Sequence, residues 1–328
     1  MKTNKYVVTG ATGFVGSKML DLLDSSESQI VAVSRKQPKN KNAYFIQQDF
    51  GKDFFINERK LTDIDYIFHL AGIAHSTFSD LTWDDYYQVN VLGTKQLCEL
   101  AGKNGVKKFI FVSSIKASSD PGVDCVNETW NMMPSDHYGK SKYLAELAVK
   151  EISEKYNMDY VIIRPTLVYG PNIKGNLLKM IQAIDNNRFP PIPKMTNKRS
   201  LVHVEDLCRA LILVAKSDAA NGNTYIVSDS NYYSTREIYE AMMSELGKPL
   251  GKITIPKFYF NSVAVLGDIL ENVFNVKFPL NSSSVEKLFG SACYDSTKIS
   301  EQLGFQPKWT LESAMPQIIE SYRKSSKI

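Results

Sequence analysis

Short apolar runs alternate with longer amphipathic segments through the first half of the chain. The runs predict strands at Tyr6–Thr9, Ile30–Ser34, Tyr44–Gln47, Tyr66–His69, Phe109–Ser113 and Tyr160–Arg164. Between them, apolar residues at i, i+3 and i+4 predict helices at Gly13–Leu23, Val89–Asn104 and His137–Lys155. Strands that alternate with helices in this way predict an α/β fold built on a doubly wound parallel sheet.

The alternation of strands and helices ends after Arg164, where loops rich in proline and glycine indicate that a second, smaller lobe begins. Within that lobe, Glu205–Lys216 has the pattern of a helix, and the capping box Ser234–Glu237 opens another helix that ends at Gly247. We therefore expect residues 1–170 to form one domain. Residues 171–328 should form a smaller α+β lobe, with strands that can cross back between the two.

Composition narrows the class of protein. The 328 residues are 43% hydrophobic, and a net charge of +4 is spread along the chain, so neither a nucleic acid nor another polyanion is expected as a partner. The four cysteines form no CxxC pair: Cys98, Cys125, Cys208 and Cys293. This spacing fits a reducing compartment and predicts neither a metal site nor a disulfide framework. An apolar strand begins almost at once in place of a signal peptide, so we expect a cytoplasmic protein.

The longest apolar segment runs from Phe258 to Leu280. Asp268, Glu271 and Lys277 interrupt it, so we expect no integral membrane segment here. Burial within the smaller lobe is the leading interpretation. Contact with a membrane surface and burial in a dimer are the alternatives.

Three glycines follow the first strand at every third position: Gly10, Gly13 and Gly16. Gly10 suits a tight turn, Gly13 lets backbone N–H groups approach a phosphate, and Gly16 lets the next helix lie against the strand. The positive end of that helix would then hold the pyrophosphate of a dinucleotide. A glycine triplet alone is a weak signal, but its position between an apolar strand and a helix predicts a Rossmann-type domain.

The ends of the next two strands bear on which dinucleotide binds. An acid at the end of the second strand favours a free ribose 2′-hydroxyl, whereas an arginine accommodates a 2′-phosphate. Here the strand runs into Ser34, Arg35 and Lys36, so NADP(H) is preferred over NAD(H) as the cofactor. Arg35 could instead stack on adenine or point to water. Asp49 could accept from the adenine amino group, or simply belong to a surface turn.

Tyr138 and Lys142 carry the strongest chemical signal. They are four residues apart on a predicted helix, so the phenol and the ammonium share a face. A tyrosine has a pKa of about 10, and a nearby cation lowers it toward the range of a general base. Ser114 follows the fifth strand at the sheet edge where ligands bind. Together with the glycine loop, these residues predict a catalytic Tyr, Lys and Ser set.

These motifs occur in the order found in the extended short-chain dehydrogenase/reductases, and the chain resembles their NAD-dependent epimerase/dehydratase family almost end to end. The segments that carry the resemblance are Thr9–Gly16, His69–Gly72, Val89–Thr94, Ser114, Tyr138 with Lys142, Arg164–Pro165 and Ser200–Asp206.

The resemblance implies hydride transfer at C4 of a nucleotide-linked sugar. Tyr138 would exchange the proton of the sugar hydroxyl, Ser114 would hydrogen-bond the same oxygen, and Lys142 would hold the nicotinamide ribose. It implies cofactor contacts by a larger set: Gly10, Thr12, Gly13, Phe14, Val15, Gly16, Arg35, Asp49, Phe50, Leu70, Ala71, Gly72, Asn90, Val112, Lys142 and Pro165.

For the substrate, a UDP-sugar, the resemblance places Asn176 and Arg199 at the diphosphate. A guanidinium suits this task because its fork matches phosphate oxygens. The alternatives are a helix cap for Asn176 and a surface charge for Arg199. His75 would face the sugar or cap a loop, and Lys116 would contact its acyl or hydroxyl groups. Many relatives add a second basic residue, and only Lys287 could serve here.

The segments Ala74–His75, Ser113–Lys116 and Lys174–Leu178 are similar to those of bacterial 4-keto-reductases that complete UDP-N-acetylquinovosamine-type sugars. They imply NADPH-dependent reduction of a UDP-4-keto-6-deoxy-hexosamine. The alternative is a UDP-glucose or UDP-N-acetylglucosamine 4-epimerase, which uses the same residues and retains its cofactor. A 4,6-dehydratase is disfavoured, because Ile115 and Lys116 stand where those enzymes usually carry Asp-Glu.

A non-catalytic dinucleotide sensor is a further alternative, which the presence of both Tyr138 and Lys142 opposes. Relatives often pair through a four-helix bundle. The predicted helices Val89–Asn104 and His137–Lys155 are long enough to build one, so we expect a homodimer.

Overall fold

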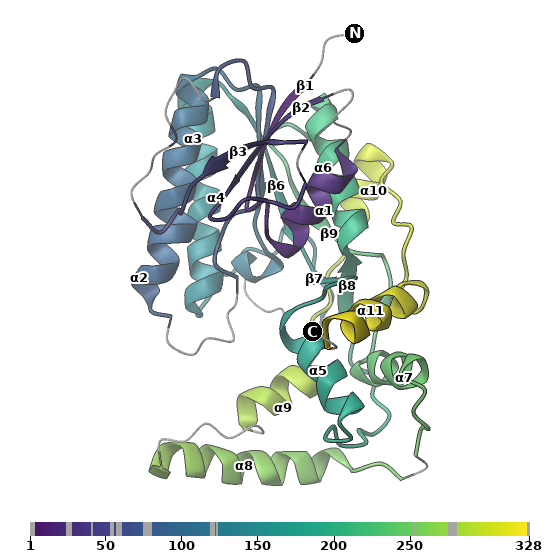
Figure 1. The fold of residues 1–328 in the computed structure, drawn as a ribbon. Coiled ribbons are helices and arrows are strands. Elements are labelled where there is room, and N and C mark those ends of the chain that lie inside the picture. The colour runs from purple at the N-terminus through teal and green to yellow at the C-terminus, as the bar shows by residue number, and fades with distance from the viewer. Residues whose placement is uncertain are drawn as a thin grey trace.

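Seven parallel strands form the sheet of the larger lobe (Figure 1). The structure, a computed structural model, describes residues 4–23, 28–40, 42–52, 56, 61–74, 81–118, 122, 124–251, 253–274 and 281–326. The sheet has the order β3-β2-β1-β4-β5-β6-β9, with bounds β1 Asn4–Thr9, β2 Ser28–Ser34, β3 Tyr44–Gln47, β4 Tyr66–His69, β5 Lys108–Val112, β6 Asp159–Pro165 and β9 Thr224–Val227. All neighbouring pairs are parallel, which confirms the predicted α/β Rossmann-type fold.

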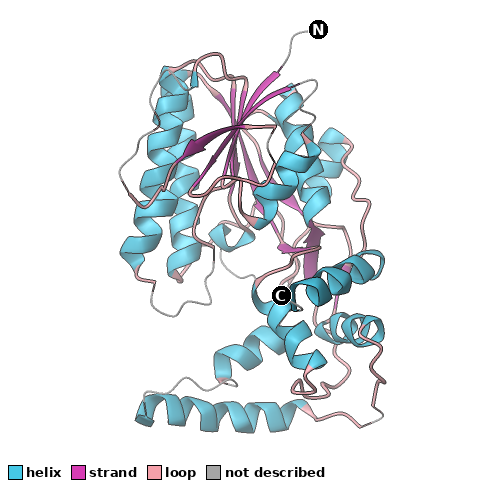
Figure 2. Cartoon of the chain, viewed as in Figure 1, coloured by secondary structure: helices cyan, strands magenta, loops and turns pink. Residues whose placement is uncertain are grey.

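Helices cover both faces of this sheet (Figures 1 and 2). One face is covered by α2 Trp83–Tyr86, the π-helix η2 Tyr87–Leu92, α3 Gly93–Lys103 and α4 His137–Tyr156; the other by α1 Phe14–Leu22, α6 Val204–Lys216 and α10 Thr297–Leu303. Each side has its own buried core, with Leu97 and Val149 in the first and Leu20 and Leu211 in the second. The strands are buried on both faces and consequently read as continuous apolar runs.

The smaller lobe is built around a three-stranded sheet of order β10-β8-β7, with bounds β7 Leu167–Tyr169, β8 Arg199–His203 and β10 Tyr232–Tyr233. Its helices among the described residues are α5 Gly175–Asp185, α7 Thr235–Glu245, α8 Lys257–Phe274, α9 Ser282–Phe289 and α11 Leu311–Ser326. Two short 3-10 turns in the described part of the chain are η3 Ile115–Ser118 and η4 Asp218–Ala220. Ile181, Met242 and Ile318 belong to its separate core. The predicted capping box is present at the start of α7, where the side chains of Ser234 and Glu237 each accept from the other's backbone N–H.

The six predicted strands agree with the observed bounds within two residues at each end. The helix predicted to begin at Val89 begins instead at Trp83, because Thr82 and Asp85 form a capping box before it. Its Tyr87–Leu92 stretch is a π-helix, a form often found at functional sites.

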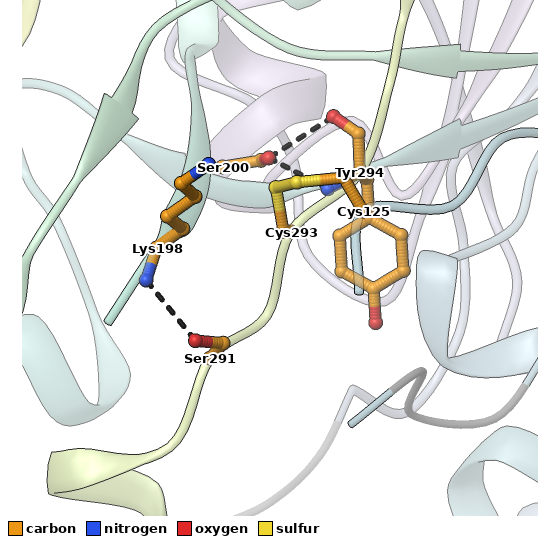
Figure 3. The surroundings of a disulfide bond; sticks show 6 residues. All are labelled: Cys125, Lys198, Ser200, Ser291, Cys293 and Tyr294. Carbon is orange, nitrogen blue, oxygen red and sulfur yellow. Dashed lines mark hydrogen bonds between the residues drawn. A yellow bond between two sulfur atoms is a disulfide. The ribbon is translucent and has the colours of Figure 1, made fainter. Parts of the chain in front are cut away.

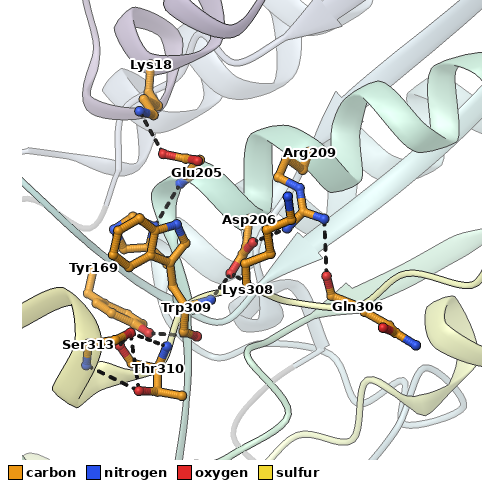
Figure 4. Close-up of polar contacts among 11 residues, drawn as sticks. Lys18, Tyr169, Glu205, Asp206, Arg209, Gln306, Lys308, Trp309, Thr310 and Ser313 are labelled. Atoms are coloured by element: carbon orange, nitrogen blue, oxygen red, sulfur yellow. Dashed lines mark hydrogen bonds and ion pairs between the residues drawn. The ribbon is translucent and has the colours of Figure 1, made fainter.

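The chain passes between the two lobes more than once. β9 follows β8 and α6 in sequence, yet it pairs with β6 at the edge of the large sheet. The buried carboxylate of Asp206 at the start of α6 accepts from the backbone N–H groups of Lys308 and Trp309, both at 2.9 Å (Figure 4). Asp206 thereby fixes the segment that leads into α11.

One expectation about the cysteines is wrong. Cys125 and Cys293 form a disulfide with their Cα atoms 4.5 Å apart, although 168 positions separate them (Figure 3). A single β-bridge between Val126 and Tyr294 brings the two segments together, and a second bridge, between Arg199 and Ala292, joins the Cys293 segment to β8. Sequence spacing does not reveal this pairing. Cys98 and Cys208 are free and buried.

The expected burial of the apolar segment Phe258–Leu280 is also wrong for most of its described part. α8 buries Phe260 and Ala264 against the lobe, but most of its other large apolar side chains face solvent. Among the described residues, no helix combines the length and apolar character needed to cross a bilayer.

The disulfide gives a direct prediction. Protein denatured without reductant should expose two reactive thiols, those of Cys98 and Cys208, and after reduction four. Reduction should also lower the free energy of unfolding by about 2–5 kcal/mol, because the bond closes a long loop in the unfolded chain. Thiol titration with urea denaturation measures both, and four thiols before reduction would contradict the pairing.

Candidate active site

The glycine loop between β1 and α1 has the geometry that its spacing predicts. Gly10 has φ of +65°, and its carbonyl accepts from the N–H of Gly13 at 2.8 Å. A methyl group at Gly16 would overlap the carbonyl of Gly10, so only glycine lets α1 lie this close to the strand. Gly13, the N-cap residue of α1, has no side chain to bond the first turn, and that turn contains no acid. Its N–H groups and positive dipole end are therefore available to a phosphate.

A buried hydrogen-bond network beside this loop fixes the turn after β4. The Thr9 hydroxyl oxygen accepts from the N–H groups of Leu70 and Ala71 at 3.1 and 3.0 Å, and it contacts Nδ1 of His69 at 2.7 Å. Nε2 of His69 lies 2.9 Å from the Thr94 hydroxyl, which donates to the carbonyl of Asn90 at 2.6 Å. These directions assign a neutral imidazole with its proton on Nε2. The sequence revealed His69 only as part of a motif.

Burial is the main reason why the pKa of His69 falls to about 3, and the positive charge of Lys142 adds to it. His69 therefore stays neutral throughout the neutral range. Its role is to position the turn at Leu70 and Ala71, two of the predicted cofactor contacts.

Asn90, on the π-helix, connects this turn to α4. Its amide donates to the carbonyl of Ile73 at 3.0 Å and to the hydroxyl of Ser141 at 2.9 Å, and its oxygen accepts from the N–H of Ile73 at 2.8 Å. A Cβ at Gly72 would lie 2.9 Å from that oxygen and 3.2 Å from Nζ of Lys142. One small region at the carboxyl ends of the strands thus contains Gly72, Asn90 and Lys142.

Lys142 is buried, and its ammonium donates to the carbonyl of Val112 at 3.0 Å and lies 4.9 Å from the centre of the Phe111 ring. Burial lowers its pKa to about 8, against the opposing negative charge of Glu146. The predicted residues Gly72, Asn90, Val112 and Lys142 are therefore adjacent in space.

Tyr138 lies one turn before Lys142 near the start of α4, where Asp136 caps the helix by accepting from the N–H of Gly139 at 2.9 Å. The phenol is partly buried and hydrogen-bonded to Ser114. Burial raises the pKa of Tyr138, and the Ser114 hydrogen bond only partly opposes this rise. The sequence analysis expects Lys142 to lower this pKa. In the protein alone the pKa is raised instead, and the Lys142 ammonium donates to the Val112 carbonyl.

A buried ion pair that the sequence did not reveal joins α4 to β6. The carboxylate of Glu146 accepts from Nε and Nη2 of Arg164 at 2.9 and 2.7 Å, and from the Ser113 hydroxyl at 2.5 Å. Glu146 lies four residues after Lys142 and so shares its face of the helix, and this spacing is the sequence signal that could have indicated its place in the site.

The remaining cofactor residues lie along the same sheet edge. Arg35 is exposed directly after β2, and its carbonyl accepts from the side chain of Gln47 at 3.1 Å. The side chain of Asp49 accepts from the N–H of Gly51 at 3.1 Å. This is the surface turn that was the alternative to a contact with the adenine amino group. Phe50 is buried, with its ring centre 5.4 Å from that of His69. Thr12, Phe14 and Val15 lie in or next to the first turn of α1, and Pro165 ends β6.

The predicted substrate residues are more dispersed. Lys116 is in η3, where its N–H donates to the Ser114 hydroxyl at 3.2 Å, which places it beside the Tyr138 contact. Asn176 is exposed in the first turn of α5. Arg199 begins β8, and its guanidinium donates to the Thr235 hydroxyl at 3.1 Å and to the carbonyl of Lys287. His75 lies outside the described residues.

Comparison with known proteins agrees with this geometry. Residues 6–228 match the family model described as "NAD dependent epimerase/dehydratase family". The chain is 30% identical to a UDP-glucose 4-epimerase of Vibrio cholerae, over 98% of this chain and 96% of that protein. It is 26% identical to an N-acetyl-alpha-D-glucosaminyl-diphospho-ditrans,octacis-undecaprenol 4-epimerase of Escherichia coli O157:H7, over 96% and 94%.

The solved structure of MoeE5 in complex with UDP-glucuronic acid and NAD superposes with a TM-score of 0.77 at 24% identity, covering 98% of this chain and all of that one. This likeness extends through both lobes and concerns the fold.

The His69 network predicts a pH-dependent difference in stability. Because His69 is neutral when folded but titrates near 6.5 when unfolded, its contribution is fully present above pH 6.5 and is lost as the pH falls toward 3. Between about pH 6 and pH 4 the native protein should lose roughly 1.4 kcal/mol per pH unit more than His69→Gln.

Urea denaturation of both proteins at several pH values measures this difference. His203, whose pKa is lowered to about 4, acts in the same direction as His69, whereas Asp229, whose pKa is raised to about 6, acts in the opposite one. Both are present in each protein and cancel in the comparison. Equal slopes would contradict the prediction.

Proposed function

We propose, because the chain belongs to the NAD dependent epimerase/dehydratase family, that it is a 4-epimerase of sugars carried on a diphosphate, UDP-sugars in the first place. The observation that carries this proposal is the Ser114–Tyr138 hydrogen bond one helical turn from Lys142, at the sheet edge that also holds the glycine loop. Homology to two 4-epimerases across nearly the whole chain supports the position of the reaction on the sugar.

The residues of the site fit a nicotinamide dinucleotide. The first turn of α1, which follows Gly13 without a side-chain cap, suits the pyrophosphate. Gly72 has no side chain to collide with Asn90 and Lys142, so both can lie close to it, and the Lys142 ammonium would hold the nicotinamide ribose. The cofactor, when bound, supplies a hydride acceptor and donor for sugar C4.

In this mechanism Tyr138 takes the proton of the C4 hydroxyl as that carbon loses hydride, and returns it when hydride comes back to the opposite face. Ser114 holds the same oxygen through its hydroxyl. Because burial raises the pKa of Tyr138, the phenol is protonated in the protein alone. We propose that the Lys142 ammonium, one helical turn away, lowers this pKa when cofactor and substrate are bound.

A C4 keto-reductase is the second candidate, and Arg35 is the observation that favours it. No acid lies at the end of β2, and the exposed guanidinium can pair with a 2′-phosphate. We propose NADP(H) as the preferred cofactor on this ground. A reductase consumes and exchanges NADPH, whereas an epimerase regenerates its cofactor in each cycle.

Arg199 and Asn176 are proposed to hold the substrate diphosphate, and Lys116 the sugar. A diphosphate is common to UDP-sugars and to the lipid-linked substrate named for the Escherichia coli relative. Either carrier can therefore be recognised through the same guanidinium.

We also propose a homodimer through α3 and α4, which pack side by side and are joined by the Lys155–Glu99 ion pair at 3.0 Å. The outer side of α4 leaves Leu147 44% exposed, which suits a bundle with a second copy.

The proposed reaction predicts interconversion of UDP-glucose with UDP-galactose, or of their N-acetylated counterparts, by purified protein without added cofactor. Tyr138→Phe should lower the rate by about 10²–10⁴-fold, because it removes the proton donor and leaves the fold intact. Product analysis by NMR, with circular dichroism as the folding control, tests both. Strict dependence on added NADPH and a 4-keto sugar would contradict the epimerase activity and favour the reductase activity.

The cofactor preference has its own test. Arg35→Asp should raise the dissociation constant for NADPH by about 100-fold, because a charge-assisted pair with the 2′-phosphate becomes a repulsion. The constant for NADH should change little. Lys36→Asp is the matched control for net charge, and fluorescence titration measures the constants of the native protein and both variants for NADPH and for NADH. Equal effects of Arg35→Asp on both cofactors would contradict the preference.

A further inference from the structure

The ring of Tyr86, the last residue of α2, lies beside the ring of Tyr138. The two ring centres are 6.2 Å apart, and 54° separates the two planes. Aromatic pairs prefer offset or tilted arrangements with centres about 4.5–7 Å apart, because the positive edge of one ring then meets the negative face of the other. Tyr86 is only 6% exposed, so this contact is largely shielded from water.

Trp83, one turn earlier on α2, contacts the residues on either side of Tyr138. Its ring centre is 5.9 Å from that of His137, and the Lys140 ammonium lies 5.0 Å from the centre of the indole ring. Trp83 and Tyr86 are three residues apart and therefore share one face of α2. This face is turned toward the first turn of α4, and the two helices lie on the same side of the large sheet (Figure 1).

Tyr86 lies between two points where the chain is fixed. Before it, Thr82 and Asp85 form the capping box of α2, in which the Asp85 carboxylate accepts from the N–H of Thr82 at 2.8 Å. After it, the π-helix η2 follows without a break, and its Asn90 amide donates to the Ser141 hydroxyl on α4 at 2.9 Å. The ring of Tyr86 is thus held against α4 from both ends of its segment.

Tyr86 contacts a part of Tyr138 that other neighbours do not fix. The Tyr138 carbonyl accepts from the Ser141 hydroxyl at 2.8 Å, and the phenol hydroxyl is hydrogen-bonded to Ser114. Between these two points the ring can still change its rotamer about the Cα–Cβ bond. A packed neighbouring ring opposes such a change, because the phenol would collide with it or leave an empty space. The contact with Tyr86 acts on the side of the ring, where this restraint is needed.

We propose that Tyr86 is a positioning residue for the 4-epimerase reaction, whose ring keeps the Tyr138 phenol directed at Ser114 and at the sugar hydroxyl. This inference rests on the proposed function, in which the phenol oxygen must come within hydrogen-bond distance of the C4 hydroxyl. Tyr86 acts through the shape of its ring and transfers no proton. A displacement of reacting groups by about 1 Å can cost roughly 100-fold in rate, so a small rotation of the phenol has a large effect.

Steady-state kinetics of UDP-glucose epimerisation test this role. Tyr86→Leu should lower kcat by about 10-fold and leave KM within about twofold, because it disturbs the phenol and leaves the diphosphate contacts in place. Tyr86→Phe keeps the ring and should retain the native kcat. Tyr66→Leu is the matched control and should also retain it, since Tyr66 pairs with Tyr6 at 5.5 Å and begins β4, at the end of the strand opposite the site.

Fluorine NMR of protein labelled with fluorotyrosine reports on the phenol in the protein alone, without cofactor or substrate. The Tyr138 signal is assigned by its absence in Tyr138→Phe. It should be narrow in the native protein, in Tyr86→Phe and in Tyr66→Leu. In Tyr86→Leu it should shift and broaden, because the phenol then occupies more than one rotamer. Circular dichroism checks the fold, and Tyr86→Met, whose flexible side chain fills irregular space, replaces Tyr86→Leu if that variant is unfolded.

Three results would overturn the proposal. They are an unchanged Tyr138 signal in Tyr86→Leu, a native kcat in that variant, and an equal loss of kcat in Tyr86→Leu and Tyr86→Phe, which would assign the effect to the Tyr86 hydroxyl. If the native protein does not interconvert UDP-sugars, the proposed function is rejected. The fluorine spectra still decide in that case whether Tyr86 positions the phenol.

Discussion

The arrangement of the site depends on the buried ion pair between Glu146 and Arg164. Their side chains are only 1 and 5% exposed, and Ser113 adds a third hydrogen bond to the same carboxylate. Such a pair contributes little net stability, but either partner left alone would be a buried, uncompensated charge. The pair therefore holds α4 in one position against β5 and β6. Because Tyr138, Lys142 and Glu146 follow one another at intervals of four on α4, fixing the last also fixes the direction of the other two.

The parts of this arrangement that the sequence predicts are those that depend on neighbouring residues. The strand Tyr44–Gln47 and the loop from Gly10 to Gly16 are encoded by local apolar runs and glycine spacing, and both lie where predicted. The network of Thr9, His69 and Thr94 joins three elements that are 60 and 25 positions apart, and it exists only once β1 and β4 are paired. The disulfide lies beside an isolated β-bridge between two distant segments, Val126 with Tyr294, which no periodicity encodes.

Two failed expectations have a common physical origin, since each assigned an environment from residue type alone. A run as apolar as Phe258–Leu270 normally indicates burial, yet which face of a helix meets the protein is decided by the partners available. Here α8 turns inward only Phe260 and Ala264, which join the core, together with Asp268 and Glu271, which bond to the start of α9. Likewise, a lysine four residues from a tyrosine indicates a lowered phenol pKa. Here Lys142 binds the Val112 carbonyl, and burial raises the pKa of Tyr138. In both cases the residues lie on the helix that the sequence predicts, but the groups that they contact are not the ones that residue type suggests.

The late return of β9 to the large sheet has a consequence for how the chain is made. Because β6 ends at Pro165 and its partner strand comprises Thr224–Val227, a nascent chain emerging from the ribosome leaves one side of β6 without its neighbour while β7, α5, β8 and α6 are still being synthesised. Unpaired strand edges are where aggregation begins. The core of the smaller lobe also includes Leu311 and Ile318, so that lobe is completed only when α11 has been made. Removal of α11 would therefore cause misassembly of the lobe rather than the loss of a detachable part.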